Sequence, residues 1–207
     1  MYAKRLYLAS ESERRIQILR RLGVEFTVLK PKTTEIHRGE PRSIAVSNAL
    51  SKARSVVDAV DQGLIIAADT VVVIDGTVLG KPGDEEDAKR MLRMLSGRWH
   101  TVLTGLAVLT APERLEFTSF EETRVKFKKL SDREVEFYVA TGEPFGKAGG
   151  YAIQGYASLF IDRLEGCYFN VVGLPVRRLY GLLRKAGVDL LDYVSVCFRG
   201  SSLNRCY

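Results

Sequence analysis

Residues 64–74 read LIIAADTVVVI, an apolar run rich in Val and Ile that ends at the turn pair Asp75-Gly76. Its length and its β-branched residues predict a strand rather than a helix. A strand that is apolar on both faces belongs in the middle of a sheet that is covered on both sides. This stretch therefore predicts an α/β protein whose sheet is organised around residues 64–74.

Two polar residues interrupt this run, a carboxylate at Asp69 and a hydroxyl at Thr70. An ionised carboxylate is costly to bury without a partner, so the group would neutralise or recruit a cation. Asp69 therefore either has a structural partner or lies where the sheet opens to a functional site. The stretch by itself leaves both interpretations open.

Hydrophobic spacing in the rest of the chain predicts further strands and helices. Strands are expected at residues 5–9, 24–28, 102–109, 117–127, 156–161 and 168–172. Helices are expected at residues 12–23, 41–60, 84–97, 131–139 and 175–187. Loops rich in Gly, Pro or polar residues are expected at 31–41, 77–84 and 142–155. The pattern predicts one domain over residues 1–189 and a peripheral C-terminal tail over residues 190–207.

The chain of 207 residues is basic, with 31 Lys and Arg against 25 Asp and Glu and a net charge of +6. Such an excess suits either a nucleic-acid surface or a pocket for a small polyanion. The basic residues are scattered over predicted helices and form no long run. Solvated helix faces explain most of them, so nucleic-acid binding is disfavoured.

Targeting and redox signals are sparse. No apolar stretch is long enough for a membrane span, and no long apolar region follows the basic residues near the N-terminus. The three cysteines, Cys167, Cys197 and Cys206, lack metal-ligand spacing. These features predict a cytoplasmic protein with free thiols and no membrane partner.

The first strand, a turn with Ser10 and Ser12, and the helix that follows form a possible anion site, because free backbone N–H groups point outward there. Arg14 and Arg15 fall in the first turn of that helix, where the helix dipole disfavours cations unless an anion lies nearby. Two solvated arginines and two anion ligands are both compatible with this pattern.

Other charged residues lie in or beside the predicted loops. Glu35 falls in the loop 31–41, Lys81 in the tight loop after the central strand, and Lys147 in a window with five glycines at residues 142, 146, 149, 150 and 155. Lys52 falls off the apolar stripe of its helix and, taken alone, is predicted to be a surface lysine. Gly80-Lys81 is not a P-loop, because the glycine spacing is missing.

Cations and carboxylates in one cleft would suit a metal-bound polyphosphate, since carboxylates bind Mg²⁺ and Lys and Arg bind phosphate oxygens. A carboxylate could also act as the base that activates water for attack on phosphorus. Sequence spacing does not show whether these loops converge.

Six motifs in order carry a closer resemblance. They are Leu8-Ala9-Ser10-x-Ser12-x-Arg14-Arg15; Ala68-Asp69-Thr70-Val71-Val72; Leu79-Gly80-Lys81-Pro82; Leu95-Ser96-Gly97 with His100 and Thr104-Gly105; Lys147-Ala148-Gly149-Gly150-Tyr151-Ala152-Ile153-Gln154-Gly155; and Asn170-Val171-Val172-Gly173-Leu174-Pro175. Over residues 5–187 the chain closely resembles the Maf family of nucleoside triphosphate pyrophosphatases, also called septum-formation inhibitors.

The resemblance implies a mixed central sheet flanked by helices, with two lobes around a cleft, similar to the inosine triphosphate pyrophosphatases. It implies hydrolysis of a nucleoside triphosphate to the monophosphate and pyrophosphate by a cytoplasmic homodimer. The implied cofactor is a divalent metal cation, Mg²⁺, Mn²⁺ or Co²⁺.

Carried over by position, the resemblance makes Asp69 the proton acceptor and Glu35 and Asp69 the metal ligands. The implied substrate-binding residues are Ser10, Arg14, Arg15, Lys52 and Lys81. Whether Asp69 acts as the base or mainly as a metal ligand stays open.

Three positions resemble specificity markers of the family: Arg14, Thr70 and Gln154. They match the branch that acts on dTTP and UTP, whereas the 7-methyl-GTP branch has Trp, Gln and Glu there. The sequence departs from the first motif at Glu13, where the family usually has Pro. The alternatives are the same reaction on purine or 7-methyl-GTP-type nucleotides, and a nucleotide-binding regulator of cell division without catalysis.

Overall fold

The computed structural model describes residues 5–194, and its centre is a seven-stranded sheet in the order β2-β1-β3-β5-β6-β7, with β4 paired to β3. The strands are β1 (Leu6–Ala9), β2 (Thr27–Leu29), β3 (Gly63–Ile74), β4 (Thr77–Leu79), β5 (Trp99–Ala111), β6 (Glu116–Phe127) and β7 (Ile161–Glu165). The predicted strand at residues 64–74 is confirmed as β3, in the middle of this sheet.

The sheet is mixed. Strands β2, β1 and β3 run parallel to one another, whereas β3, β5, β6 and β7 are antiparallel neighbours. Strands β3 and β5 pair along almost their whole length, from Gly63 opposite Ala111 to Val73 opposite Thr101. The predicted mixed α/β architecture is confirmed.

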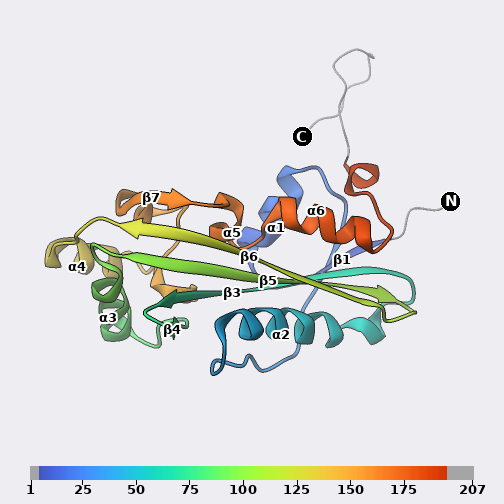
Figure 1. Ribbon diagram of the computed structural model, residues 1–207, viewed down its shortest axis with the longest axis horizontal. Helices are drawn as coiled ribbons and strands as arrows, with labels where there is room; N and C mark the ends of the chain where they lie inside the picture. Colours follow the sequence, from blue (N-terminus) through green and yellow to red (C-terminus); the bar gives the residue numbers. More distant parts are fainter. Residues whose placement is uncertain (1–4, 195–207) are drawn as a thin grey trace, which may run out of the picture.

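Helices cover the sheet in two groups (Figure 1). Helix α2 (Pro41–Arg54) lies on one face, and α1 (Glu13–Arg21) and α6 (Val176–Lys185) lie on the other. Helices α3 (Glu85–Leu95) and α4 (Asp132–Ala140) gather at the far end of the long strands. Two lobes with separate apolar cores therefore share one sheet.

Alternate residues of β3 point to opposite faces, as in any strand. Ile65 and Ala67 pack with α2, whereas Leu64 and Ile66 pack with α1 and α6. Asp69 continues the first series and Thr70 continues the second. The two polar residues of β3 therefore face opposite sides of the sheet.

One edge of β3 is interrupted. Strand β1 pairs with residues 64–66, and β4 pairs with residues 72–74. Within residues 5–194, no strand pairs with residues 67–71 along that edge. Asp69 and Thr70 lie at the centre of this gap.

Helix ends follow the predicted signals. Pro41 lies in the first turn of α2, the side chain of Asp84 accepts a hydrogen bond from Asp87 N at the start of α3, and Ser131 and Glu134 form a capping box at the start of α4.

Several predicted elements differ from the structure. Residues 168–172 form helix α5 (Tyr168–Val172), not a strand, because Asn170 N and Val171 N bond to Cys167 O and Gly173 caps the helix at φ 121°. The expected strand at 156–161 is a 3-10 helix, η3 (Tyr156–Leu159), and β7 begins only at Ile161. Residues 77–79, predicted as loop, pair with β3 as β4.

Other predicted boundaries were also wrong. Helix α2 ends at Arg54 and is followed by a 3-10 turn, η1 (Val57–Ala59), and β2 starts at Thr27 rather than residue 24. The window at 142–155 contains a short 3-10 turn, η2 (Ala148–Gly150).

The predicted tail at 190–207 lies mostly outside the described residues, as do Cys197 and Cys206. Its first residues form a 3-10 turn, η4 (Leu190–Tyr193), whose Leu190 is buried in the core beside α6.

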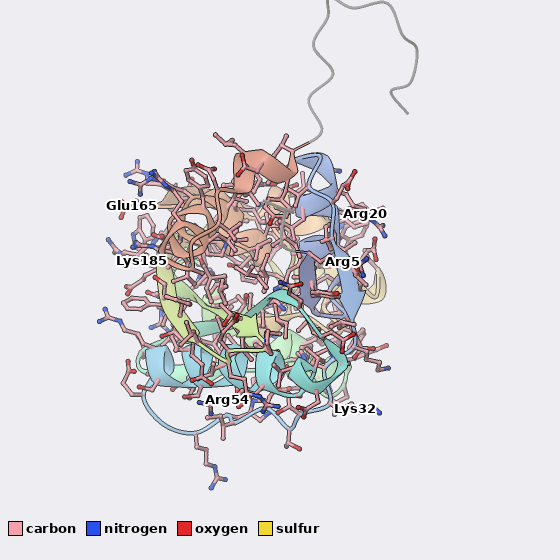
Figure 2. All side chains as sticks on the ribbon, turned by 90° about the vertical axis from the view of Figure 1, so that its right-hand side faces the viewer. Arg5, Arg20, Lys32, Arg54, Glu165 and Lys185 are labelled. Carbon is pink, nitrogen blue, oxygen red and sulfur yellow. The ribbon has the colours of Figure 1, made fainter. Side chains whose placement is uncertain are left out.

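Charged side chains extend outward from this framework, as the labelled residues of Figure 2 show. Many of the basic ones are paired with surface carboxylates, among them Arg42 with Glu122, Arg54 with Glu116, and Arg178 with Glu121. None of the helices in the described part of the chain has the length and apolar character needed to cross a membrane.

Candidate active site

A pocket of about 790 Å³ opens at the gap in the edge of β3. This volume is within the range of small-molecule sites. Nine residues singled out from the sequence line it: Ser10, Ser12, Arg14, Arg15, Glu35, Lys52, Asp69, Thr70 and Lys81. The structure therefore brings together loops whose convergence the sequence left open.

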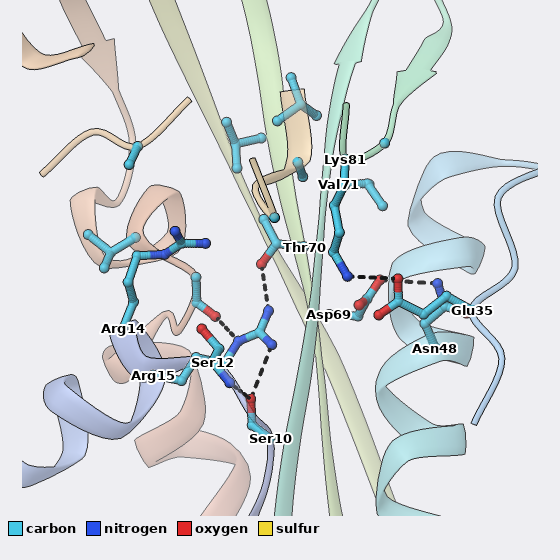
Figure 3. A pocket seen from close by; sticks show the side chains of 18 of the residues that line it. Ser10, Ser12, Arg14, Arg15, Glu35, Asn48, Asp69, Thr70, Val71 and Lys81 are labelled. Carbon is cyan, nitrogen blue, oxygen red and sulfur yellow. Dashed lines mark hydrogen bonds and ion pairs between the residues drawn. The ribbon is translucent and has the colours of Figure 1, made fainter. Parts of the chain in front are cut away.

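We call the side of the pocket formed by Asp69, Glu35, Lys52, Asn48 and Lys81 the carboxylate wall (Figure 3). Asp69 is only 6% exposed. Its Oδ1 accepts a hydrogen bond from Lys52 Nζ at 2.5 Å, and its Oδ2 accepts one from Asn48 Nδ2 at 3.1 Å. A buried carboxylate with an ammonium and an amide donor is stabilised in its ionised form.

Lys52 joins the two carboxylates of this wall. Its Nζ also donates to Glu35 Oε1 at 2.7 Å, while Lys81 Nζ lies 3.4 Å from Glu35 Oε2. Burial alone would raise the pKa of Glu35, but the hydrogen bond and charge of Lys52, with help from Lys81, outweigh it and lower the pKa to about 2. Glu35 is therefore a carboxylate at neutral pH.

The prediction that Lys52 is a surface lysine was wrong, because it is 8% exposed and faces β3. The inward face of α2 carries Asn48 and Lys52 one turn apart, so both reach Asp69. A helix that packs polar residues against a site does not show a clean apolar stripe.

Gly105 allows α2 to come this close. It lies opposite Asp69 in the register of β3 and β5, and a Cβ there would lie 2.3 Å from the backbone of Ala45 in α2. Any larger residue at position 105 would push the helix that carries Asn48 and Lys52 away from Asp69.

Asn48 also fixes the loop that carries Glu35. Its Oδ1 accepts from Ile36 N at 2.9 Å, and its Nδ2 donates to Ile36 O at 3.0 Å. The sequence analysis missed Asn48, although its place one turn before Lys52 was a usable signal.

We call the opposite side, formed by Arg15, Ser10, Thr70, Thr104 and Gly173, the arginine wall. Arg15 donates from Nε to Gly173 O at 2.8 Å, from Nη2 to Thr70 Oγ1 at 3.0 Å, and from Nη1 to Ser10 Oγ at 3.4 Å. All three acceptors are neutral, and in the described part of the chain Arg15 forms no ion pair. Burial lowers the pKa of Arg15 from its ordinary high value, and the guanidinium stays charged at neutral pH.

The remaining predicted residues are placed as follows. Arg14 lines the pocket, and burial lowers its pKa while Tyr138 and Glu143 raise it. Ala152 and Ile153 line the pocket, but the neighbouring Gln154 is exposed and does not. Lys147 also lies outside the lining, where its Nζ donates to Phe145 O at 3.3 Å. The specificity role of Gln154 stays a prediction.

The chemistry of the carboxylate wall fits a divalent cation. Asp69 and Glu35 both converge on Lys52 Nζ, so their oxygens already point to one place where positive charge is stable. Each carboxylate oxygen has more than one lone pair, which leaves acceptor capacity beside the lysine contacts. Among residues 5–194 no group of three or more His, Cys, Asp or Glu side chains could hold a metal, so phosphate oxygens and water would complete the shell, as is usual for Mg²⁺.

An ionised carboxylate pair beside a buried arginine defines a phosphate-handling hydrolase pocket rather than an apolar ligand site. Comparison with known proteins agrees with this class. The family model for Maf-like proteins matches residues 5–186, and the chain belongs to the Maf family.

Curated relatives match nearly the whole chain. A protein of Dictyoglomus thermophilum is 46% identical over 191 residues, covering 91% of this chain and 99% of that protein, and is named dTTP/UTP pyrophosphatase. The same name is given to a protein of Pelotomaculum thermopropionicum, which is 48% identical over 91% of this chain and 100% of its own. Among solved structures, the Staphylococcus aureus Ham1 protein matches 60% of this chain and 72% of its own with a TM-score of 0.43 and 15% identity, a likeness too weak to carry an argument.

Proposed function

We propose that this protein hydrolyses nucleoside triphosphates, with dTTP and UTP preferred, to the nucleoside monophosphate and pyrophosphate. The observation that carries the proposal is the buried Asp69, held by Lys52 and Asn48 across the pocket from Arg15. The names of the curated relatives support the same reaction.

In the proposed reaction, a water molecule attacks the α-phosphorus and transfers a proton to Asp69. The new bond joins the water oxygen to the α-phosphorus, and the bond from the α-phosphorus to the bridging oxygen breaks, so pyrophosphate leaves. Lys52 keeps Asp69 ionised and ready to accept the proton. Arg14, Arg15 and Lys81 neutralise charge on the phosphates as it builds up.

Asp69 and Glu35 would hold a divalent cation, Mg²⁺, Mn²⁺ or Co²⁺. When bound, such an ion supplies positive charge to the phosphate oxygens and makes a bound water more acidic. Asp69 could then act as a metal ligand as well as a base, and both roles need its ionised form.

The preference for pyrimidine nucleotides rests on Arg14, Thr70 and Gln154 and on the relatives' names. A cellular role in removing modified pyrimidine nucleotides would follow from it. We also propose that the enzyme is a cytoplasmic homodimer, which sedimentation of the purified protein would test.

The decisive experiment is a panel of dTTP, UTP, CTP, GTP, ATP and 7-methyl-GTP with Mg²⁺, Mn²⁺ or Co²⁺, with pyrophosphate release as the readout. We expect fastest release from dTTP and UTP. Asp69→Asn should lower kcat by about 10³-fold, as removal of a general base does. Asp162→Asn, on the exposed surface of β7, is the matched control and should keep wild-type activity.

Three outcomes would contradict the proposal in different ways. Preferred hydrolysis of GTP or 7-methyl-GTP would move the substrate class. Tight nucleotide binding without pyrophosphate release at any metal would favour a non-catalytic regulator of cell division. Wild-type activity of Asp69→Asn would remove Asp69 from the mechanism.

A further inference from the structure

Two of the sequence motifs have no role in the reaction described so far: Thr104-Gly105 in β5 and the segment that starts at Asn170. They meet at the arginine wall. Thr104 lies opposite Thr70 in the register of β3 and β5 and is fully buried. Its Oγ1 lies 2.9 Å from Thr70 Oγ1 and 3.1 Å from Asn170 O.

The proton positions in this chain of contacts follow from donor counting. A backbone carbonyl can only accept, so the single hydroxyl proton of Thr104 is donated to Asn170 O. Thr104 Oγ1 must then accept in its contact with Thr70, so Thr70 donates its own proton to Thr104. Arg15 Nη2 donates to the same Thr70 oxygen.

Thr70 therefore has no proton left to donate to a nucleotide. Its hydroxyl is used to connect Thr104 with Arg15. This is not the arrangement expected of a side chain that reads the carbonyl groups of a pyrimidine base, which need a donor.

Asn170 is itself immobilised. Its side chain is fully buried, and Nδ2 donates to Val102 O at 3.0 Å and to Thr123 Oγ1 at 2.9 Å. Three residues later, Gly173 O accepts from Arg15 Nε. The segment 170–173 thus fixes Arg15 at two points, once directly through Gly173 and once through Thr104 and Thr70.

We infer that Thr104 is a positioning residue for Arg15, and that Thr70 acts on the substrate through Arg15 rather than by contact with the base. Of the five N–H donors of a guanidinium, three are used by Gly173, Thr70 and Ser10. The remaining two face the pocket's ligand and suit phosphate oxygens. This inference rests on the proposed function only in assigning the phosphates to a nucleoside triphosphate.

The test uses the whole chain and inorganic tripolyphosphate, which carries the phosphates without a base. Titration calorimetry with Thr104→Val should show a loss of affinity of about tenfold, the size expected when one hydrogen bond that orients a charged group is lost. Thr104→Ser removes a buried methyl group but keeps the hydroxyl, so it should bind within about twofold of wild type. Thr110→Val, which removes a buried hydroxyl elsewhere on β5, is the matched control and should bind like wild type.

The Ser and Val variants separate positioning from core packing. If Thr104 only fills space, Thr104→Ser will weaken binding at least as much as Thr104→Val, and the inference is overturned. In an Arg15→Lys background, Thr104→Val should have no further effect on binding, because the group that it positions is gone. Independent losses in that double variant would also overturn the inference.

Hydrolysis assays test the role of Thr70. Thr70→Val should raise KM by the same factor for dTTP, UTP and GTP, and Thr104→Val should do likewise. A change in the ratio of dTTP to GTP turnover in Thr70→Val alone would assign Thr70 to base reading instead. If the wild-type protein hydrolyses no nucleotide, the proposed function fails, while the tripolyphosphate series still decides the positioning role; a wild-type protein that does not bind tripolyphosphate would overturn it.

Discussion

The two walls of the pocket hold their cations in different ways. On the carboxylate wall, two ammonium groups, those of Lys52 and Lys81, contact two carboxylates, those of Asp69 and Glu35, so the charges of the four groups sum to zero. On the arginine wall, the contacts of Arg15 are a carbonyl and two hydroxyls. The positive charge of Arg15 is therefore not cancelled by a contacting group.

This difference assigns different tasks to the walls. A neutral, tightly paired cluster keeps carboxylates ionised and ready to accept a proton or bind a cation, but attracts an anion only weakly. A guanidinium held by neutral groups keeps its charge for the ligand. Proton transfer belongs to the first wall and phosphate capture to the second.

The largest expected effect comes from removing Lys52. Lys52→Met would leave Asp69 and Glu35 facing each other without their shared cation, and we expect the free energy of unfolding to fall by about 3 kcal/mol. Arg15→Met would strand only neutral acceptors and should cost about 1 kcal/mol. Urea unfolding at pH 7 measures both, and equal losses would mean that the two walls do not differ as described.

Gly105→Ala should damage the carboxylate wall selectively. The new methyl group would overlap the α2 backbone, and we expect a loss of stability of about 2 kcal/mol and a fall in kcat, with little change in tripolyphosphate affinity. Gly181→Ala, in α6 with open space around it, is the matched control and should be neutral or slightly stabilising. A loss of tripolyphosphate affinity as large as the loss of kcat would argue against separate walls.

Asn48→Ala tests the connection between Asp69 and the Glu35 loop. It removes the amide that joins Asp69 Oδ2 to Ile36, and we expect kcat/KM for dTTP to fall by about 10- to 100-fold, as for other residues that orient a reacting group. An unchanged kcat/KM would show that Lys52 alone positions Asp69.

The smallest effect is on the pH dependence of stability. Glu35 has a folded pKa of about 2 against an ordinary value of 4.5. Its contribution is therefore fully present above pH 4.5 and is lost as the pH falls toward 2. Urea unfolding at pH 5 and pH 3 should show a smaller loss for Glu35→Gln than for wild type.

Glu134 provides the control for this measurement. The hydrogen bond from Lys128 and those from Ser131 also lower its pKa to about 2, but it lies far from the pocket in the capping box of α4. Glu134→Gln should likewise reduce the pH dependence while leaving hydrolysis unchanged. Loss of activity in both variants would indicate a folding defect rather than a site effect.

The sequence predicted the elements whose signals are local. Helices α1, α3, α4 and α6 have apolar stripes and clear ends, and β3 has a long run of β-branched residues. Helix α5 was predicted as a strand because Tyr, Phe and Val favour strands. The side-chain bonds of Asn170 to β5 and β6 anchor these residues as a helix instead, and no local pattern carries that information.

The site was predictable residue by residue but not as an arrangement. Motifs named the charged groups, whereas the burial of Lys52 depends on how closely α2 approaches β3, which Gly105 decides from another strand. Thr104 was visible as part of a motif, but its role depends on the cross-strand register that places it opposite Thr70. Register and helix approach are properties of the folded chain, not of any one segment.

The placement of Asp69 and Thr70 as neighbours on β3 makes the site depend on parity. Odd-numbered residues of this stretch face α2 and even-numbered ones face α1 and α6. Inserting or deleting one residue between positions 66 and 69 would exchange the two sides, turning the carboxylate toward the guanidinium and the hydroxyl toward the lysine. Such a change would leave composition and strand propensity almost untouched and still invert the electrostatics of the pocket, so in this segment the count of residues is as much a part of the catalytic design as their identity.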